Sequence, residues 1–315
     1  MQFIEVNKSI SKEDLVTPVK NYISECLSKN TKINYACSWK SFTKWCADRN
    51  VASLPSTPEI VSAFFADHAD NGFSPPTIVH RCAAIKKAHE FAGYDSPTAS
   101  ILVKKTVAGI KRTIKHSPDR KAPATAERIE QMISHCDNSV IGLRDKALLL
   151  IGFLGAFRRS ELIALTVNDI EQTAEGIKII IRQSKTDQEG KGQTIAILNG
   201  INFRAVDALM HWLKIANITD GYLFRSIRKG GNVQKEGLSS QSIANIIKHY
   251  AKKSGFTVDQ FSGHSLRAGF LTSAAEAGAS IFKMTEISRH KDIQTVMGYV
   301  RSAKIFENHA SDKFA

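Results

Sequence analysis

The sequence predicts a mainly α-helical protein in two parts: a helical bundle over residues 12–115 and an α+β domain over residues 125–315. Three observations lead to this prediction. Stretches with apolar residues at helical spacing follow one another through the first part. A basic segment rich in turn residues, 116–124, separates the two parts and is expected to be a linker. The second part contains two β-branched runs, which predict a small antiparallel sheet in an otherwise helical domain.

Four or five short helices are expected in the first part. Thr31 is the expected cap of one helix, whose apolar stripe follows at i, i+4, i+7 and i+11. Two further helices are expected where a capping residue precedes proline, because proline is favoured in the first helical turn. These starts are Thr57-Pro58 and Ser74-Pro75-Pro76. A last helix is expected over about residues 98–115, and it runs into the basic segment.

The charge balance favours a polyanionic partner. The chain has 43 Lys and Arg against 30 Asp and Glu, a net charge of +13. Such an excess most often indicates nucleic acid and less often a membrane surface, although it also keeps a protein soluble without any partner. Basic side chains on the polar faces of the predicted helices are candidate phosphate contacts, unless they are merely solvated. These candidates are Lys40, Lys44, Arg81, Lys86, Lys87, Lys104, Lys105, Lys111 and Arg112.

Other features argue against several classes of protein. The five cysteines are an odd number without a Cys-x-x-Cys pair, so neither a disulfide framework nor a zinc site is expected. The N-terminus lacks the pattern of a signal peptide. The longest apolar run, 147–157, is about half the length that a membrane span requires. We therefore expect a soluble cytoplasmic protein without a bound metal or cofactor.

The first candidate site residues of the second part follow the end of an apolar core helix. Arg158 and Arg159 follow that helix directly, and Glu161 comes soon after. Arginines near an interior are costly unless they meet an anion, although a structural pair between Arg158 and Glu161 would also satisfy them. Further on, the two predicted strands, 177–182 and 193–197, are joined by a turn-rich hairpin connection that carries Lys185.

Two histidine-containing patterns follow in the last sixty residues. His264 and Arg267 are spaced i, i+3, so both can reach one ligand from the same helix face. His290 and Tyr299 are nine residues apart, which would place them on opposite faces of a single helix. Asp292 can cap a new helix that starts at Ile293, and this break would let both side chains turn toward a common point. Each pattern alone is more often ordinary packing.

Taken together, these residues describe a phosphate site with a nucleophile and no metal. Arginine forks match the non-bridging oxygens of phosphate, and phosphoryl-type chemistry depends mainly on positioning and charge stabilisation. A tyrosine, whose ordinary pKa is about 10, becomes a nucleophile when a neighbour takes its proton or when cations favour the phenolate. The set is Arg158, Lys185, His264, Arg267, His290 and Tyr299.

The order of these motifs resembles that of the tyrosine recombinase (phage integrase) family, in its two-domain Xer-like or Cre-like form. The segment 156–162 is similar to the family's first arginine motif, and its alignment selects Arg158 over Arg159. Ser184-Lys185-Thr186 resembles the hairpin lysine, and His264-Ser265-Leu266-Arg267 the His-x-x-Arg motif. His290 and Tyr299 match the second histidine and the nucleophile. Arg289 stands where the family often has glycine.

The resemblance implies a site-specific DNA recombinase. Residues 12–115 would be a SAM-like core-binding domain, and residues 125–315 the catalytic domain. Tyr299 would form a 3′-phosphotyrosyl link, and two rounds of exchange through a Holliday junction would involve a homo-tetramer on double-stranded DNA, with accessory DNA-bending or directionality proteins. Two alternatives remain: an inactive DNA-binding protein on the same fold, and a relaxase similar to type IB topoisomerases.

The resemblance also implies a role for each site residue. Arg158 and Arg267 would stabilise the charged transition state, and His290 would help to hold the phosphate. Lys185 would be the general acid for the leaving 5′-oxygen. His264 would handle the proton of the nucleophile, with Glu161 as a supporting residue.

Overall fold

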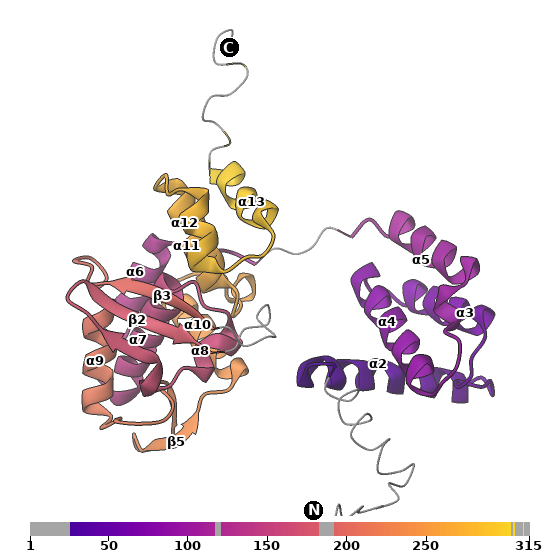
Figure 1. Cartoon of the computed structure of the whole chain (residues 1–315), viewed down its shortest axis with the longest axis horizontal. Coiled ribbons are helices and arrows are strands. Elements are labelled where there is room, and N and C mark those ends of the chain that lie inside the picture. The colour runs from indigo at the N-terminus through magenta and orange to yellow at the C-terminus, as the bar shows by residue number, and fades with distance from the viewer. Residues whose placement is uncertain (1–25, 117–120, 183–191, 304, 306–310, 312–315) are drawn as a thin grey trace, which may run out of the picture. The chain divides into compact units, whose positions relative to one another are not determined.

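The computed structural model describes residues 26–116, 121–182 and 192–303, together with residues 305 and 311. The chain divides into two compact units, residues 1–118 and 119–315 (Figure 1). The fold is mainly helical with a small antiparallel sheet, which confirms the predicted fold class. Lys185, the predicted hairpin lysine, lies outside the described residues. Within the described ranges, no helix has both the length and the apolar character needed to span a bilayer.

Unit 1 is a helical bundle around one apolar core. Its described elements are α2 (Lys29–Ala47), α3 (Pro58–Asp70), α4 (Pro75–Phe91), the short 3-10 helix η1 (Pro97–Ala99) and α5 (Ile101–Thr113). The helix α2 packs against α4, and α3 packs against α5. Phe42, Phe64 and Ile85 are wholly buried between these pairs. The exposed faces of the helices therefore remain available for polar side chains.

The helix starts of unit 1 only partly follow the predicted capping chemistry. The helix α4 begins at Pro75 as predicted, but the Ser74 side chain makes no capping hydrogen bond. The cap of α2 is Ser28 rather than Thr31: the Ser28 hydroxyl accepts the backbone N–H of Thr31 at 3.3 Å. The last helix begins after Ser100, whose hydroxyl accepts the N–H of Val103 at 3.2 Å, and not near residue 98. Thr57 caps α3 with Pro58 in the first turn, as predicted.

Unit 2 has a largely buried helix, α7 (Val140–Leu154), in its core. Its helices are α6 (Ala126–Ser134), α7 (Val140–Leu154), α8 (Arg159–Ala164), α9 (Ala205–Ile215), α10 (Ser240–Lys253), α11 (Ser265–Glu276), α12 (Ile281–Ser288) and α13 (Ile293–Ala303), with 3-10 turns η2 (Val167–Asp169) and η3 (Val258–Gln260). Its strands are β1 (Ile170–Gln172), β2 (Gly176–Ile181), β3 (Gln193–Leu198), β4 (Arg225–Ile227) and β5 (Val233–Gly237). The helix α7 is buried along most of its length, as its apolar sequence predicts.

The sheets are antiparallel and more extensive than the sequence predicts. Strand β2 pairs with β1 on one side and with β3 on the other, so that Ile179 faces Ile195 across the predicted pair. The edge strand β1 is only three residues long, too short for an alternating pattern to reveal it. Strands β4 and β5 form a second sheet around the turn at Gly230 and Gly231, and this sheet is not predicted from the sequence.

Three helices at the C-terminal end of unit 2 carry much of the candidate site, and α11 packs against α7, α12 and α13 (Figure 1). The chain breaks between α12 and α13 as predicted. The Asp292 carboxylate accepts the backbone N–H of Gln294 at 2.9 Å and so caps α13.

The described end of the predicted linker, residues 121–124, packs within unit 2. The backbone N–H of Ala122 donates to the Gln260 carbonyl at 2.7 Å, and that of Ala124 to the Ser265 carbonyl at 2.9 Å. Gly269 permits this approach, because a Cβ at this position would lie only 1.8 Å from the carbonyl oxygen of Ala124. Residues 122–124 therefore fix the start of α11 through backbone hydrogen bonds.

Candidate active site

The floor of the site is the tight turn that follows α7. Ala156 has a φ of +45°, a left-handed conformation that is uncommon for a residue with a side chain. This turn ends α7 and leaves the carbonyl groups of Gly155 and Ala156 free of the helix. Two arginines from the C-terminal helices donate to these carbonyls. The turn thereby provides fixed acceptors for guanidinium groups.

Arg158 and Glu161 form a capping arrangement at the start of α8. Glu161 accepts the backbone N–H of Arg158 at 2.9 Å through Oε2, and the Arg158 guanidinium donates to Oε1 at 2.5 Å. The carboxylate is almost wholly buried. Burial alone would raise the pKa of Glu161, but the charge of Arg289 and the hydrogen bonds from Arg158 outweigh it and hold this pKa below its ordinary value. Glu161 is therefore ionised at neutral pH.

Arg267 reaches the same turn from α11. Its Nη1 donates to the Ala156 carbonyl at 2.8 Å, while Nη2 lies 3.2 Å from Nε2 and 3.3 Å from Nδ1 of His290. Burial, followed by repulsion from Arg158 and Arg289, lowers the pKa of Arg267 to about 9. An anion placed beside Arg158 and Arg267 would relieve this repulsion. The site is consequently suited to bind a negatively charged group.

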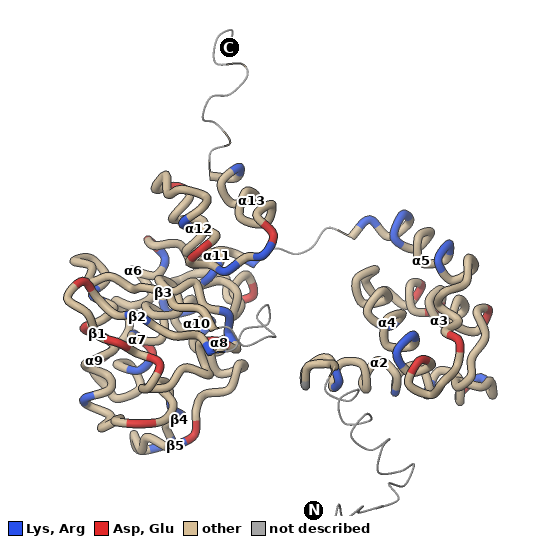
Figure 2. Tube along the Cα trace, in the orientation of Figure 1, with Lys and Arg blue, Asp and Glu red and all other residues tan. Residues whose placement is uncertain are grey.

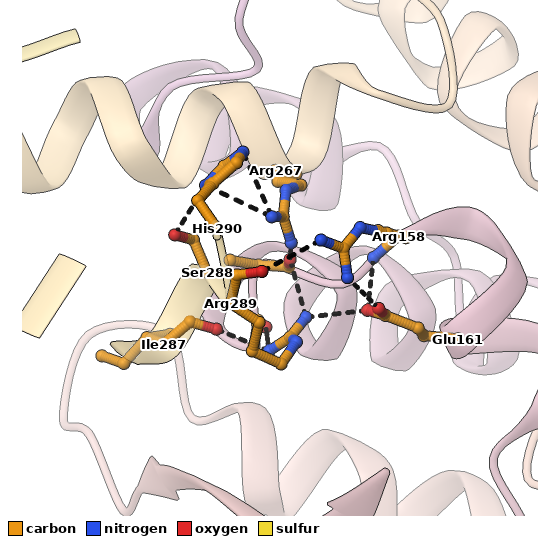
Figure 3. Close-up of polar contacts among 9 residues, drawn as sticks. Arg158, Glu161, Arg267, Ile287, Ser288, Arg289 and His290 are labelled. Atoms are coloured by element: carbon orange, nitrogen blue, oxygen red, sulfur yellow. Dashed lines mark hydrogen bonds and ion pairs between the residues drawn. The ribbon is translucent and has the colours of Figure 1, made fainter. Parts of the chain in front are cut away.

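His290 lies just after α12, half-buried beside Arg267 (Figure 3). Its Nδ1 lies 2.8 Å from the Ser288 hydroxyl. Burial and then the positive charges of Arg267, Arg158 and Arg289 lower the pKa of His290 from 6.5 to about 4. At neutral pH the imidazole is uncharged, so it can offer a hydrogen bond to a ligand without adding charge.

This pKa can be tested directly. An NMR titration of the full chain is expected to give a pKa near 4 for His290. Arg267→Met should move that pKa upward toward 6.5, because removing a neighbouring cation favours the imidazolium ion. The resonance of His290 is assigned by its loss in His290→Asn. Arg301→Met, at an exposed position of α13, is the control and should leave the pKa of His290 unchanged. A wild-type pKa close to 6.5 would contradict the prediction.

Tyr299 lies on α13 with its ring against a small apolar cluster. The cluster consists of Leu271, Ala275, Met284 and Val296. The residue is half-buried, and within the described part of the chain no group hydrogen-bonds to its hydroxyl. Tyr299 is also close enough to Arg267 for an ionised phenol to raise the pKa of that arginine. The apolar cluster thus holds the ring while the hydroxyl remains available.

Of the two remaining predicted residues, the structure describes only His264. His264 occupies the cap position of α11, and it is exposed. The preceding Gly263 lies directly against the Arg159 side chain. The contact is so close that a Cβ at Gly263 would lie 1.8 Å from the Arg159 Cδ. The two adjacent arginines therefore have different surroundings: Arg158 joins Glu161, whereas the stem of Arg159 covers Gly263. Lys185 cannot be placed, since it lies outside the described residues.

Sequence reasoning missed one deeply buried member of the cluster, Arg289. Its side chain is 1% exposed and donates to Glu161 Oε2 at 2.8 Å (Figure 3). Arg289 ends α12 with a φ of +58°, which costs a residue with a side chain about 1–2 kcal/mol. The sequence did contain a signal, namely an arginine where the resembled family often has glycine.

In the described residues no group of three His, Cys, Asp or Glu side chains could hold a metal ion.

The predicted phosphate contacts of unit 1 differ in their surroundings. Lys40, Lys44 and the basic residues of α5 are exposed. Lys86 and Lys87 both pair with Glu90, at 3.6 and 2.7 Å. Arg81 is half-buried, and its guanidinium lies 4.2 Å from the centre of the Phe73 ring, so the unit itself already engages this side chain.

Comparisons with known proteins all identify integrases and recombinases as similar to this chain. The profile of the family described as "Phage integrase family" matches residues 124–305. The integrase/recombinase xerD homolog of Selenomonas ruminantium is 34% identical over 307 residues, which cover 96% of this chain and 90% of the relative. The recombinase cre of Escherichia phage P1 is 26% identical, over 84% of this chain and 81% of the relative.

Solved structures share the fold at low sequence identity. The Tn1549 transposon integrase in complex with transposon right end DNA superposes with a TM-score of 0.66 at 15% identity, covering 91% of this chain and 96% of that one. The XerH site-specific recombinase in a post-cleavage complex with its difH substrate gives a TM-score of 0.62 at 14% identity, over 79% of this chain and 70% of that one.

Proposed function

The chain belongs to the phage integrase family, and we propose that it is a site-specific DNA recombinase that cuts and rejoins duplex DNA through Tyr299. The observation that supports this most is the cluster formed by Arg158, Arg267 and His290. It combines excess positive charge with an available tyrosine hydroxyl nearby. A phosphodiester is the anion that matches both features.

The proposed reaction exchanges one phosphodiester for another. The Tyr299 oxygen attacks the phosphorus, the bond to the 5′-oxygen breaks, and a 3′-phosphotyrosyl link forms. Arg158 and Arg267 stabilise the charge that develops on the non-bridging oxygens, and neutral His290 donates a hydrogen bond. His264 takes the phenol proton, and Lys185 protonates the leaving 5′-oxygen. Attack by a 5′-hydroxyl from the partner strand reverses the step, so no ATP is consumed.

The number of strands argues for a tetramer. Recombination between two duplexes requires four strand cuts, and each chain carries one Tyr299. We therefore propose that four copies, as two dimers, act on a pair of double-stranded sites and pass through a Holliday junction. Accessory DNA-bending or directionality proteins would act on the same assembly.

DNA as the substrate and free thiols at all five cysteines suit the cytoplasm.

Unit 1 would supply phosphate contacts through α5. Lys104 and Lys111 are seven residues apart, as are Lys105 and Arg112, so each pair lies on one side of the helix, two turns apart. Figure 2 shows Lys and Arg segments along α5. All four side chains are exposed. Such a stripe matches a duplex backbone, because each neutralised phosphate releases counterions and adds salt-dependent affinity.

Neutralising this stripe should change the salt dependence of DNA binding. Lys104→Gln with Lys111→Gln is expected to lower the slope of log affinity against log salt by about 2, since each phosphate contact contributes about one unit. Filter binding or fluorescence anisotropy over a salt series measures this slope. Lys86→Gln with Lys87→Gln is the matched control and should change the slope less, because Glu90 already pairs with both lysines. Equal slopes for the two double variants would contradict the assignment.

The experiment that tests the function uses a nicked suicide duplex. A nick near the cleavage point releases a short fragment, so the covalent intermediate accumulates. Wild-type protein should give a protein–DNA adduct, and peptide mapping should locate the DNA on the peptide that contains Tyr299. No adduct from wild type would leave only the inactive DNA-binding protein. Relaxation of supercoiled plasmid without any recombination site would instead indicate an activity similar to type IB topoisomerases.

A further inference from the structure

The buried arginine at the end of α12, Arg289, forms more hydrogen bonds than a turn requires. Its guanidinium donates to the carbonyls of Gly155 at 3.1 Å, Ala156 at 3.0 Å and Ile287 at 2.5 Å, and to Glu161 at 2.8 Å. Three of these four acceptors lie more than 120 residues away along the chain. Arg289 therefore ties α12 to the turn after α7 and to α8.

We infer that Arg289 is a positioning residue for the recombination reaction, because it shares the carboxylate of Glu161 with Arg158 and so fixes Arg158 while leaving its positive charge available to the scissile phosphate. The inference rests on the proposed function. Arg289 is not itself expected to touch DNA, since its side chain is 1% exposed.

The sharing of Glu161 is visible atom by atom. Oε1 accepts Nη1 of Arg158 at 2.5 Å, and Oε2 accepts Nη2 of Arg289 at 2.8 Å (Figure 3). One carboxylate between two guanidiniums leaves one unit of positive charge. Without Arg289, Glu161 and Arg158 would form an isolated pair with no net charge, which attracts a phosphate less strongly. Arg289 thus offsets the charge of the carboxylate that orients Arg158.

Residue 289 also holds Arg158 through its backbone. Nη2 of Arg158 donates to the Arg289 carbonyl at 3.0 Å. Arg158 is consequently fixed on two sides, by the carbonyl of Arg289 and by the carboxylate that Arg289 orients. Arg267 joins the same network, because Arg267 and Arg289 both donate to the Ala156 carbonyl, at 2.8 and 3.0 Å. The three guanidiniums are connected through shared acceptors.

The backbone conformation at residue 289 does not favour an arginine. Its left-handed conformation is strained for any residue except glycine, and Nε of Arg289 is buried without an acceptor in the described part of the chain. Glycine at this position would avoid both costs, but it would also remove the ion pair with Glu161 and the hydrogen bonds to the turn after α7. A strained, buried and incompletely satisfied cation beside a reactive cluster is typical of a residue that serves function at the expense of stability.

The first test compares the single-turnover cleavage rate of the suicide duplex with DNA affinity. Arg289→Met should slow cleavage about 100-fold, the effect expected when a reacting group is displaced by about 1 Å. DNA affinity should stay within about twofold, because the side chain does not reach the surface. Arg289→Lys keeps the charge and should cleave about tenfold faster than Arg289→Met. Arg289→Gly removes the backbone strain and provides a second charge-free variant in case Arg289→Met does not fold.

The second test is a double-mutant cycle with Glu161→Gln. A carboxamide does not neutralise Arg158, so Arg289→Met should cost less than about fivefold when Glu161 is already Gln. A residue that only fills space would cost the same factor in both backgrounds. Such additivity would overturn the inference.

A matched control removes a buried ion pair elsewhere in the same unit. Arg144 pairs with Asp145 at 2.7 Å near the start of α7, far from the turn that follows this helix. Arg144→Met should lower thermal stability but leave the cleavage rate of the folded protein within about twofold. If Arg289→Met cleaved at the wild-type rate, or lost no more of the cleavage rate than Arg144→Met, the inference about Arg289 would be overturned while the proposed function would stand. No adduct from wild-type protein would instead remove the proposed function.

Discussion

Tyr299→Phe is expected to abolish formation of the covalent protein–DNA adduct, with a loss of at least about 10⁴-fold in the single-turnover cleavage rate. The substitution removes one oxygen atom and leaves the ring. Because the ring packs against the apolar cluster that contains Leu271 and Val296, its apolar contacts persist and the fold should be unchanged. DNA affinity should also be retained, since the hydroxyl is a reacting group and not a major binding contact. Denaturing gel electrophoresis of the suicide-duplex reaction measures the adduct.

Tyr222→Phe is the matched control for this experiment. Tyr222 belongs to the same unit and is 43% exposed, so it is at least as accessible as Tyr299. Its variant should form the adduct at the wild-type rate. An adduct that survives Tyr299→Phe, or one that disappears in Tyr222→Phe, would show that another residue is the nucleophile.

Local patterns predicted the parts of the site that local interactions determine. The break before α13 follows from the Asp292 cap, and Arg158 with Glu161 follows from the spacing at a helix start. The i, i+3 spacing predicts that His264 and Arg267 share a helix face; in the structure Arg267 lies in α11 and His264 is the exposed cap residue before it, so their reach to one ligand stays a prediction. Local patterns also allowed close alternatives: Ser28 and Thr31 are both capping residues, and the helix selects the earlier one.

The surroundings of Arg289 could not be predicted, because they depend on contacts between distant segments. Glu161 and Arg289 are 128 residues apart in sequence. Beside a helix end, an arginine is usually solvated. The arginine at a position where the family often has glycine marks residue 289 as unusual, but it does not indicate that the side chain turns inward. The left-handed backbone at residue 289 directs the chain, and the free carbonyls after α7 provide the acceptors. The helix α11 packs against both α7 and α12, and this packing brings residue 289 to the turn after α7.

The DNA-contact candidates show the same division. Charge alone selected Arg81 and Lys104 equally, but the structure surrounds Arg81 with aromatic rings and leaves Lys104 exposed on α5. Composition reports the sign of a surface and not which cations are engaged within the fold. For this reason the α5 stripe is the stronger basis for a binding experiment.

Arg158→Ala is expected to reduce the cleavage rate about 10²- to 10³-fold, whereas Arg159→Ala should cost less than about tenfold. The two residues are adjacent, but only Arg158 contacts Glu161 and the Arg289 carbonyl, and only Arg158 is near enough to Arg267 to lower its pKa. The stem of Arg159 lies against Gly263 instead. Single-turnover cleavage of the suicide duplex, at saturating protein, separates the chemical step from binding.

The controls for this pair address folding and charge. Removing Arg158 leaves the buried Glu161 with Arg289 as its guanidinium partner, so thermal unfolding must show that the Arg158→Ala protein is folded. Arg158→Lys keeps one positive charge but loses the two-pronged geometry, and it should fall between wild type and Arg158→Ala because a planar fork fits two phosphate oxygens better than an ammonium does. If Arg159→Ala were the more damaging variant, the arginine motif would shift by one residue, and Arg158 would become a structural partner of Glu161.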